Sequence, residues 1–260
     1  MGNKKCCLRT TKVSLVKINT RGATISHKKL NISCKNTNMK ISISKTENMN
    51  ISRNPKTLSI NIDGHPIKQV DEFKYLGSIF SADGKIDRKI ETRIQKANSV
   101  TYQIAPLLTN QHIETKVKRQ IINSIFVPTL TYQCQSWTLT NCLKSKIQAC
   151  EKRCPRKTIN VTRRDRYRND TVRTQIEIEP TQHCIAKQKI KWFGHLVRMM
   201  PSETPSMTFN TKHSGWKARG RPRKRWMDGI REVLKMHEIN TTEATHLAHQ
   251  RRLHLPSTPC

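Results

Sequence analysis

The sequence predicts an α+β protein that is mostly helical, and two periodicities and one charge pattern lead to that prediction. Between Met39 and Phe80, apolar residues alternate with polar ones, which is the period of a β-strand. Beyond Gly84 the apolar spacing lengthens to the period of an α-helix. Lysine and arginine number 49 against 18 acidic residues, a net charge of +31. We expect a disordered N-terminus, a small antiparallel β-hairpin sheet, helices, and a basic helical C-terminal region.

The N-terminal part divides at about residue 38. Residues 1–38 are rich in Lys, Thr, Asn and Ser without periodicity, so a disordered basic segment is expected. Within residues 39–84, KISISK and LSINI alternate, and NIDGHPIKQV places Asp63-Gly64 between alternating flanks, which predicts a hairpin. FKYLGSIF, Phe73–Phe80, is expected to be a further strand that ends at the Asp-Gly turn of SADGK.

Residues 85–140 predict two helices. The first runs to about Pro106 and the second to about Pro128. The apolar positions that define the first are Ile86, Ile90, Ile94, Ala97 and Ile104. The second has Val117, Ile121 and Ile125 on one face, with Lys116, Lys118 and Arg119 off it.

Residues 141–239 predict a basic helical region. A helix from Leu143 to about Arg153 meets Pro155, and the basic stretch VTRRDRYRND is expected to be a loop. TQHCIAKQKIKWFGHLVRM predicts an amphipathic helix, with Ile185, Ile190, Phe193 and Val197 on one face and Lys187, Lys189 and Lys191 flanking it. A linker is expected from Pro201 to Lys212, and then a last helix with Trp226, Ile230, Val233 and Leu234. The tail, residues 240–260, has no clear pattern.

The charge favours nucleic acid as partner, because a polyanion relieves self-repulsion of this size. A membrane surface is the alternative, although the sequence lacks the run of about 20 apolar residues that a membrane helix needs. Gly2 invites N-terminal acylation, but Cys6 stands where that pattern has Ser or Thr. With no signal peptide, we expect an intracellular protein, nuclear or cytoplasmic and not secreted, whose nine cysteines are unpaired.

No catalytic or metal centre is expected from the residues alone. The adjacent carboxylates of Asp71 and Glu72 point to opposite faces of an extended chain, which makes a poor metal cradle. A P-loop and spaced histidine pairs are missing. Cysteines and one histidine approach zinc-ligand spacing without a tight CxxC pair, so buried or idle thiols are the favoured alternative. These residues are Cys142, Cys150, Cys154, His183 and Cys184.

Five segments in series resemble the C-terminal part of a reverse transcriptase from a non-LTR, LINE-like retrotransposon. In order they are KTENM, INIDGHPIKQVDEFKYLGSIFSADGKID, TLTYQCQSWTLT, KIKWFGHLVRM and GRPRKRWMDGI, which together span about Met39 to Leu234. The resemblance implies a palm remnant over residues 39–84 with a primer-grip hairpin, a thumb over residues 85–140, and a basic nucleic-acid-binding region over residues 141–239. The partners it implies are an RNA template and a DNA primer.

The resemblance also implies roles for single residues. Lys45 matches the palm lysine that helps to protonate the leaving pyrophosphate. The primer grip corresponds to Phe73, Lys74, Tyr75, Leu76 and Gly77. The basic thumb faces that track the template-primer backbone contain Lys116, Lys118 and Arg119.

This sequence departs from the family at the catalytic centre. The family's aspartate pair precedes the KTENM segment, whereas the corresponding TKVSLVKINTRGATISHKK contains no Asp or Glu. Gln133 and Gln135 stand where the family more often has Gly and Glu. We therefore expect a truncated or decayed RNA-directed DNA polymerase that is inactive alone. The intact enzyme would use Mg²⁺, and this chain is expected to hold no metal or cofactor.

The stretch ARGRPRKRW leaves three interpretations open. Its RGRP core resembles an AT-hook, which would make the chain a nonenzymatic nuclear DNA-binding protein. A linker that touches nucleic acid and a merely solvated run of charge are the others. The residues concerned are Arg219, Gly220, Arg221, Arg223, Lys224 and Arg225. Trp137, Trp192 and Trp226 could stack on bases, but core packing is favoured for the last two.

Overall fold

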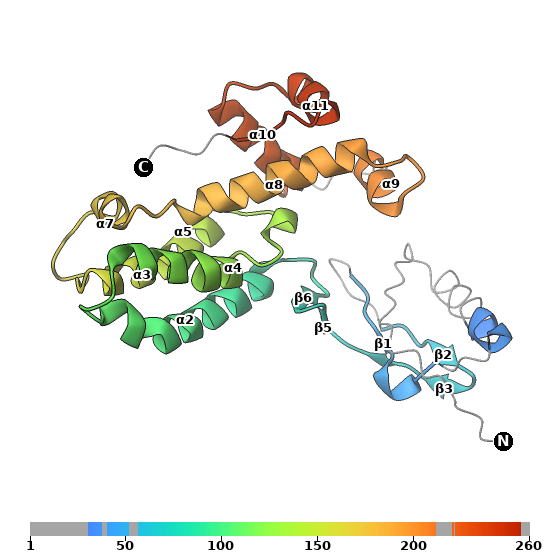
Figure 1. Ribbon diagram of the computed structural model, residues 1–260. Helices are drawn as coiled ribbons and strands as arrows, with labels where there is room; N and C mark the ends of the chain where they lie inside the picture. Colours follow the sequence, from blue (N-terminus) through green and yellow to red (C-terminus); the bar gives the residue numbers. More distant parts are fainter. Residues whose placement is uncertain (1–30, 38–40, 52–56, 212–219, 221, 256–260) are drawn as a thin grey trace, which may run out of the picture. The chain divides into compact units, whose positions relative to one another are not determined.

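The computed structural model describes residues 31–37, 41–51, 57–211, 220 and 222–255 (Figure 1). The chain forms two compact units, Met1–Lys89 and Ile90–Cys260, which are described separately below. Helices dominate and the strands are short, so the predicted fold class is confirmed.

The first unit contains the hairpin that the Asp-Gly pair predicts. Strands β2 (Asn61–Ile62) and β3 (His65–Pro66) pair antiparallel. The two turn residues both have positive φ, 49° at Asp63 and 81° at Gly64. This is the conformation that two-residue hairpin turns require and that Asp-Gly favours.

A second hairpin lies where one continuous strand was expected. Strands β5 (Glu72–Tyr75) and β6 (Ser78–Ser81) pair antiparallel, with Phe73 opposite Phe80. Leu76 and Gly77 form the turn between them, with φ of 47° and 77°. The predicted strand over Phe73–Phe80 is therefore wrong. Leucine is a poor residue for a left-handed turn position, so the pattern concealed the turn.

The strands do not form one antiparallel sheet. In the part of the chain that the structure describes they form three two-stranded pairs, and β1 (Glu47–Asn48) pairs in parallel with β4 (Lys68–Gln69). The alternating KISISK segment is helical at η1 (Ile43–Lys45). Thr46 closes this turn, because its hydroxyl donates to the Ser42 carbonyl at 2.7 Å. A local hydrogen bond of this kind competes with strand pairing.

A short helix at residues 31–36 corrects part of the predicted disordered segment. Asn31 and Lys35 lie four residues apart on one face of it and both donate to Asp63 Oδ1, at 2.7 and 2.8 Å. Cys34 on this helix is buried. Residues 1–30 and 38, on which the rest of that prediction falls, lie outside the described residues.

The second unit begins within the helix that the sequence predicts most clearly. Helix α2 (Asp87–Thr109) buries Ile90, Ala97 and Ile104 at intervals of seven residues. Pro106 is exposed and lies inside the helix near its end, as predicted.

The second predicted helix exists, but it buries a different face. Helix α3 (Thr115–Ile121) passes through a π-helical turn, η2 (Ile122–Phe126), into α4 (Val127–Leu130). The helical segment ends at Leu130, close to the predicted stop near Pro128, and the proline itself occupies the first turn of α4. The segment has two apolar rows, and the fold buries the row that also contains Lys118. The buried residues are Lys118, Ile122, Phe126 and Leu130, whereas Val117 and Ile125 are exposed.

Helix α5 (Asn141–Glu151) is followed directly by α6 (Arg153–Thr158). The predicted helix from Leu143 to about Arg153 is confirmed as α5. Pro155 lies in the first turn of α6, where a missing N–H costs little. Residues 161–168 form the predicted basic loop, and the unpredicted α7 (Asn169–Ile176) follows.

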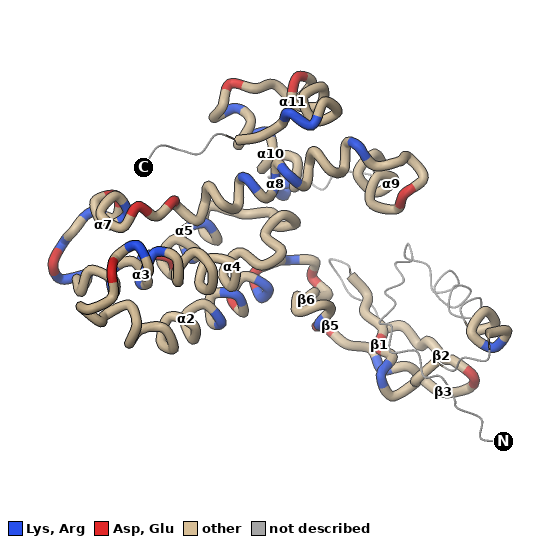
Figure 2. Tube along the Cα trace, in the orientation of Figure 1, with Lys and Arg blue, Asp and Glu red and all other residues tan. Residues whose placement is uncertain are grey.

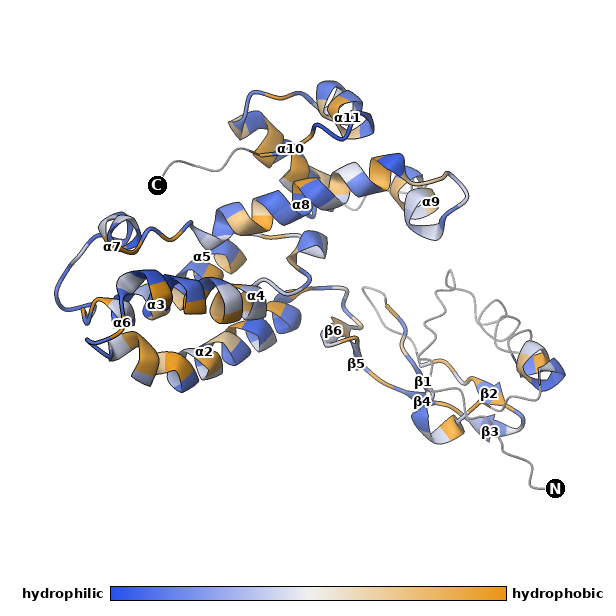
Figure 3. Cartoon of the chain, viewed as in Figure 1, coloured by the Kyte–Doolittle hydropathy of each residue, from blue (hydrophilic) through white to orange (hydrophobic). Residues whose placement is uncertain are grey.

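The predicted amphipathic helix is confirmed as α8 (Thr181–Arg198), along which apolar and polar residues alternate in Figure 3. The prediction that Lys189 flanks the apolar face of this helix is wrong, because this lysine is only 5% exposed. It lies four residues before Phe193 and four after Ile185, on the buried face.

The C-terminal helices complete the second unit. The predicted last helix is α10 (Trp226–Met236). Two helices of this C-terminal part were not predicted: α9 (Thr204–Asn210) in the expected linker and α11 (Thr241–His249) in the expected tail. Asn240 caps α11 by accepting the Glu243 N–H at 2.7 Å, a short-range pattern that the sequence does contain.

Helices α8, α10 and α11 share one apolar core. Ala244 and Ala248 of α11 are fully buried, and their small side chains permit close packing on α8. The remaining buried members are Ile190, Phe193, Ile230, Leu234 and Leu253. Among the described residues, every helix is too short or too polar to span a membrane.

Candidate nucleic-acid interface

Lysine and arginine occur on most helices of the second unit, so charge alone does not locate an interface (Figure 2). One dense group lies in residues 161–168, here called the arginine loop. Its four arginines are all exposed, and their side chains have no ion-pair or hydrogen-bond partner among the described residues. They are Arg163, Arg164, Arg166 and Arg168. Tyr167, between the last two, is 50% exposed.

Two charged side chains hold the arginine loop in shape. The Arg156 guanidinium donates to the carbonyls of Thr162 and Tyr167 and to Asn169 Oδ1, at 3.0, 2.9 and 3.0 Å. Asp165 accepts from the Thr162 N–H at 2.6 Å and from its hydroxyl at 2.9 Å. These bonds lower the pKa of Asp165, the backbone one most. The loop is therefore anchored through two residues, and its other cations stay available to a ligand.

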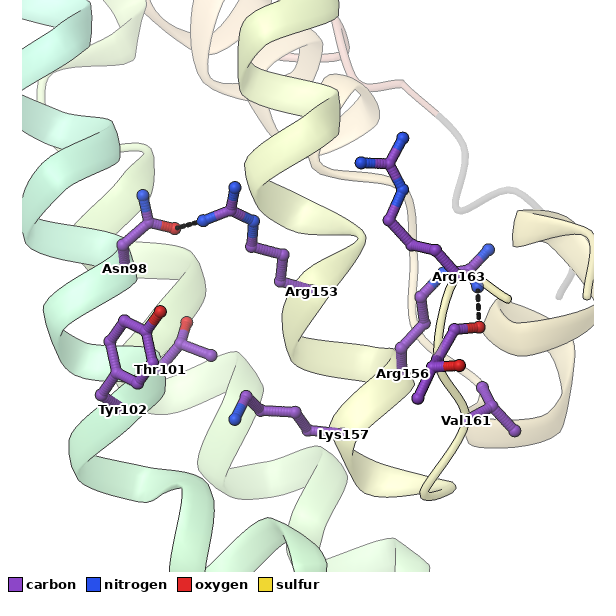
Figure 4. Close-up of a pocket in the computed structure, with 9 residues that line it drawn as sticks. Asn98, Thr101, Tyr102, Arg153, Arg156, Lys157, Val161 and Arg163 are labelled. Carbon is purple, nitrogen blue, oxygen red and sulfur yellow. Dashed lines mark hydrogen bonds between the residues drawn. The ribbon is translucent and has the colours of Figure 1, made fainter. Parts of the chain in front are cut away.

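A hollow of about 190 Å³ lies beside the loop, between α2 and α6 (Figure 4). Four of the residues that line it are cationic, and none carries a carboxylate. The lining residues are Asn98, Thr101, Tyr102, Arg153, Arg156, Lys157, Val161, Thr162 and Arg163. An anion would enter this hollow without meeting a like charge.

An exposed aromatic ring stands in the hollow with cations beside it. Tyr102 of α2 is 69% exposed, and the Lys157 ammonium of α6 lies 5.5 Å from the centroid of its ring. Arg153 donates to Asn98 Oδ1 at 3.3 Å, which turns its guanidinium toward α2 (Figure 4). Proteins that bind single-stranded nucleic acid combine such a ring, on which a base stacks, with cations that follow the backbone.

The cysteines near this hollow are structural. Burial raises the pKa of Cys150 to about 11 and that of Cys154 to about 12, so both thiols are protonated at neutral pH. Burial also raises the pKa of Cys184. Among the described residues, no cluster of His, Cys, Asp or Glu side chains could hold a metal ion.

The residues matched to the primer grip lie in the first unit. Phe73, Lys74 and Tyr75 belong to β5, and Leu76 and Gly77 form the tip of the hairpin. Leu76 is 66% exposed there in a left-handed conformation. Lys45, matched to the palm lysine, is exposed at the end of η1.

The three thumb residues have different surroundings. Lys116 is exposed, Lys118 is 5% exposed, and Arg119 forms an ion pair with Glu177. The expected placement of Lys118 on the outer basic face is therefore wrong. It shares the buried row of α3 with Ile122.

The GRPRKRW stretch is partly described. Arg219 and Arg221 lie outside the described residues, while Gly220 has a φ of +104°. Arg223 is exposed, Lys224 forms an ion pair with Glu232 at 2.5 Å, and Arg225 caps α10 through its amide, which donates to Asp228 Oδ2 at 2.7 Å.

The three tryptophans that the structure describes belong mainly to the core. Trp226 donates its indole N–H to the Gln135 carbonyl at 2.7 Å and contacts the ring of Phe209 edge-on. Trp137 is fully buried, and Trp192 is half-buried beside His195.

A transposon-derived protein resembles this chain. The relative is an uncharacterized protein of Caenorhabditis elegans, 25% identical over 184 residues. The match covers 68% of this chain and 63% of the relative, so the chain spans less than two thirds of that protein's length. No family model matches the chain, and no solved structure matches it significantly.

Sequence reasoning predicted the basic loop but did not single out its arginines as binding residues. The alternation of arginines with a tyrosine in VTRRDRYRND was the available indication. Tyr102, Arg153 and Lys157 were missed because only the packing of α2 against α6 brings them together.

Proposed function

We propose that the chain is a transposon-derived protein that binds single-stranded nucleic acid through the arginine loop and the hollow around Tyr102. The observation that carries this proposal is the lining of the hollow, where cations flank an exposed aromatic ring and carboxylates are missing. The transposon-derived relative in C. elegans supports the origin.

The aromatic ring and the cations contact different parts of the strand: the ring stacks on a base, and the cations pair with phosphates. A base stacked on Tyr102 contributes about 1–3 kcal/mol. Phosphates on either side of that base pair with Lys157, Arg153 and the loop arginines, which releases counterions and makes binding depend on salt. A single strand suits this arrangement, because its bases are free to leave the stack.

We further propose that the chain descends from the C-terminal part of a non-LTR retrotransposon reverse transcriptase. The order of the five resembling segments supports this origin. Under it, the β5–β6 hairpin corresponds to the primer grip, with Leu76 at its tip, and Lys45 corresponds to the palm lysine of the intact enzyme. The carboxylates among the described residues do not fit the Mg²⁺ site of such an enzyme, so we derive no catalytic step.

The test is fluorescence anisotropy with the full chain and a labelled single-stranded oligonucleotide at several salt concentrations. Tyr102→Ala should weaken binding by the stacking contribution and leave the salt slope unchanged. The double substitution Arg163→Ala with Arg164→Ala should lower the slope by about 1.4, because each phosphate that is no longer neutralised accounts for roughly 0.7. Lys235→Ala, an exposed cation on α10, is the control and should change neither quantity.

Unchanged affinity in Tyr102→Ala together with an unchanged slope in the double variant would contradict the proposal. An A·T-rich duplex in the same assay tests the AT-hook alternative. Only the AT-hook alternative predicts that the chain binds A·T-rich duplex in preference to other sequences and that Arg219→Ala abolishes this preference.

A further inference from the structure

Three lysines from separate parts of the second unit gather around one carboxylate. Lys144 of α5 and Lys224, just before α10, form ion pairs with Glu232 at 3.2 and 2.5 Å. Lys189 of α8 lies beside them, and the charges of Lys144, Lys224 and Glu232 all act on its ammonium. Three cations and one carboxylate leave a net charge of +2.

Lys189 is the unusual member of this lysine cluster. It is 95% buried, and its ammonium has no ion-pair or hydrogen-bond partner among the described residues. A buried, unpaired ammonium is costly, and proteins rarely keep one without a use. Burial, and then repulsion by Lys224 and Lys144, lower its pKa to about 8. Glu232 and the Cys134 thiol have the opposite, smaller effect.

The surroundings of Lys189 are built to accommodate the ammonium. A methyl group added at Gly229 of α10 would lie 3.2 Å from Lys189 Nζ, so the glycine leaves the room that the ammonium occupies. Gly229 is in the first helical turn of α10, the end of the helix that carries the positive partial charge of the helix dipole. That end of a helix repels a cation and attracts an anion.

We propose that Lys144, Lys189 and Lys224 form an oxyanion site for one phosphate group of a nucleic-acid strand, and that Glu232 occupies the place of the phosphate in the free protein. Lys189 forms the floor, while Lys144 and Lys224, with side chains 35% and 22% exposed, form the rim. The Glu232 side chain is 49% exposed and can turn out to solvent when a phosphate enters. The nature of the strand rests on the proposed function.

Phosphate fits this cluster better than an organic carboxylate does. Glu232 already supplies one carboxylate, and Lys189 is still unpaired. A phosphodiester presents two nonbridging oxygens that are not tethered to α10 as the Glu232 carboxylate is, so they can accept from all three ammoniums at once. Lysine binds phosphate in this way, as a point charge with three donors.

The first experiment removes the internal competitor in the full chain. Glu232→Gln should raise the affinity for a single-stranded oligonucleotide roughly fivefold or more, the lower range of common coupling between competing groups. Glu243→Gln removes the same charge from the exposed face of α11 and is the matched control. If Glu232 only holds α10 in place, Glu232→Gln leaves the affinity unchanged or weakens it, and the proposal is overturned.

The second experiment measures proton uptake. At pH 8.5 a group with a pKa of about 8 is roughly three quarters neutral, so binding a phosphodiester should take up as much as about 0.7 proton. Calorimetry in two buffers with different ionisation enthalpies measures this uptake. Lys189→Met should abolish it and lower the salt slope by about 0.7, whereas Lys191→Met, on the exposed side of α8, should preserve the uptake. Equal uptake in the wild type and Lys189→Met overturns the proposal.

Inorganic phosphate distinguishes the source of the oxyanion. If the oligonucleotide gives Lys189-dependent uptake, the strand assignment is supported, whether or not inorganic phosphate also binds. If inorganic phosphate gives Lys189-dependent proton uptake and the oligonucleotide does not, the proposal that the site binds a nucleic-acid strand is overturned, and the site takes a free oxyanion. The Tyr102 and arginine-loop variants test the proposed single-strand binding without changing the lysine cluster. A failure of that proposal can therefore be distinguished from a failure of the phosphate site.

Discussion

The buried lysine of α8 should make stability depend on pH in a predictable direction. Lys189→Met replaces an ammonium that is 5% exposed with an apolar side chain of similar length. Below pH 8 the wild-type lysine is charged in both the folded and the unfolded chain, so the folded protein bears the full cost of burying the charge. We expect Lys189→Met to be the more stable protein at neutral pH.

The size of the expected gain in the free energy of unfolding follows from the pKa of Lys189. Folding lowers the pKa of Lys189 from 10.5 to about 8. A difference of about 2.5, at about 1.36 kcal/mol for each pH unit, sets an upper bound of about 3 kcal/mol. Between pH 8 and 10.5 the unfolded chain binds more protons than the folded one, so the free energy of unfolding rises with pH. The advantage of Lys189→Met should shrink over that range.

The assay is urea denaturation from pH 7 to 11, followed by tryptophan fluorescence, with the free energy of unfolding compared between the wild type and Lys189→Met. Cys150 and Cys154 titrate in both proteins, so the difference between the two curves cancels them. Lys191→Met, an exposed lysine on the same helix, should differ from the wild type by an amount that does not change with pH. If the difference in the free energy of unfolding between Lys189→Met and the wild type is also independent of pH, the reasoning is refuted.

Three further substitutions test other parts of the fold. Trp226→Phe should cost about 1 kcal/mol in urea denaturation, because the hydrogen bond to the Gln135 carbonyl is removed, and should leave oligonucleotide affinity unchanged. Cys154→Ala should flatten the loss of stability from about pH 9 to 12, where the unfolded thiol of the wild type ionises and the folded one does not. Leu76→Asn should stabilise the β5–β6 hairpin by about 1 kcal/mol, measured by hydrogen exchange, because asparagine tolerates the left-handed conformation.

Local patterns were enough for some elements of the fold. The Asp63-Gly64 turn follows from two adjacent residues, and α8 follows from an apolar stripe that runs from Ile185 to Val197. Helix α3 and its continuation show where such reasoning stops, because their sequence has two apolar rows, each with a four-residue repeat and offset from the other by one residue. Only the rest of the unit decides that the row through Phe126 is buried and the row through Ile125 is not. The burial of Lys118 and Lys189 has the same cause, since a long aliphatic stem allows a lysine to occupy an apolar row.

The candidate site also has a part that local sequence predicts and a part that only the fold brings together. The arginine loop could be predicted as a basic loop, because its arginines are neighbours in the sequence. Tyr102 and Lys157 lie on different helices, and no short-range pattern relates them. The lysine cluster is further out of reach, because Lys144, Lys189 and Lys224 come from three separate segments.

The net charge of +31 does not by itself locate binding, because the fold already uses many of the cations. Arg173 is held by the buried Glu151, Arg119 by Glu177, and Arg156 by the three acceptors that shape the arginine loop. A cation held in this way gains little from a phosphate on its own, since binding it would break bonds that the cation already makes; the lysine cluster differs because Lys189 has no such bond to lose. The four loop arginines have only Asp165 among them to offset their repulsion. A phosphate backbone therefore gains most where the fold has left cations close together and unpaired, which favours the arginine loop over the equally basic helices.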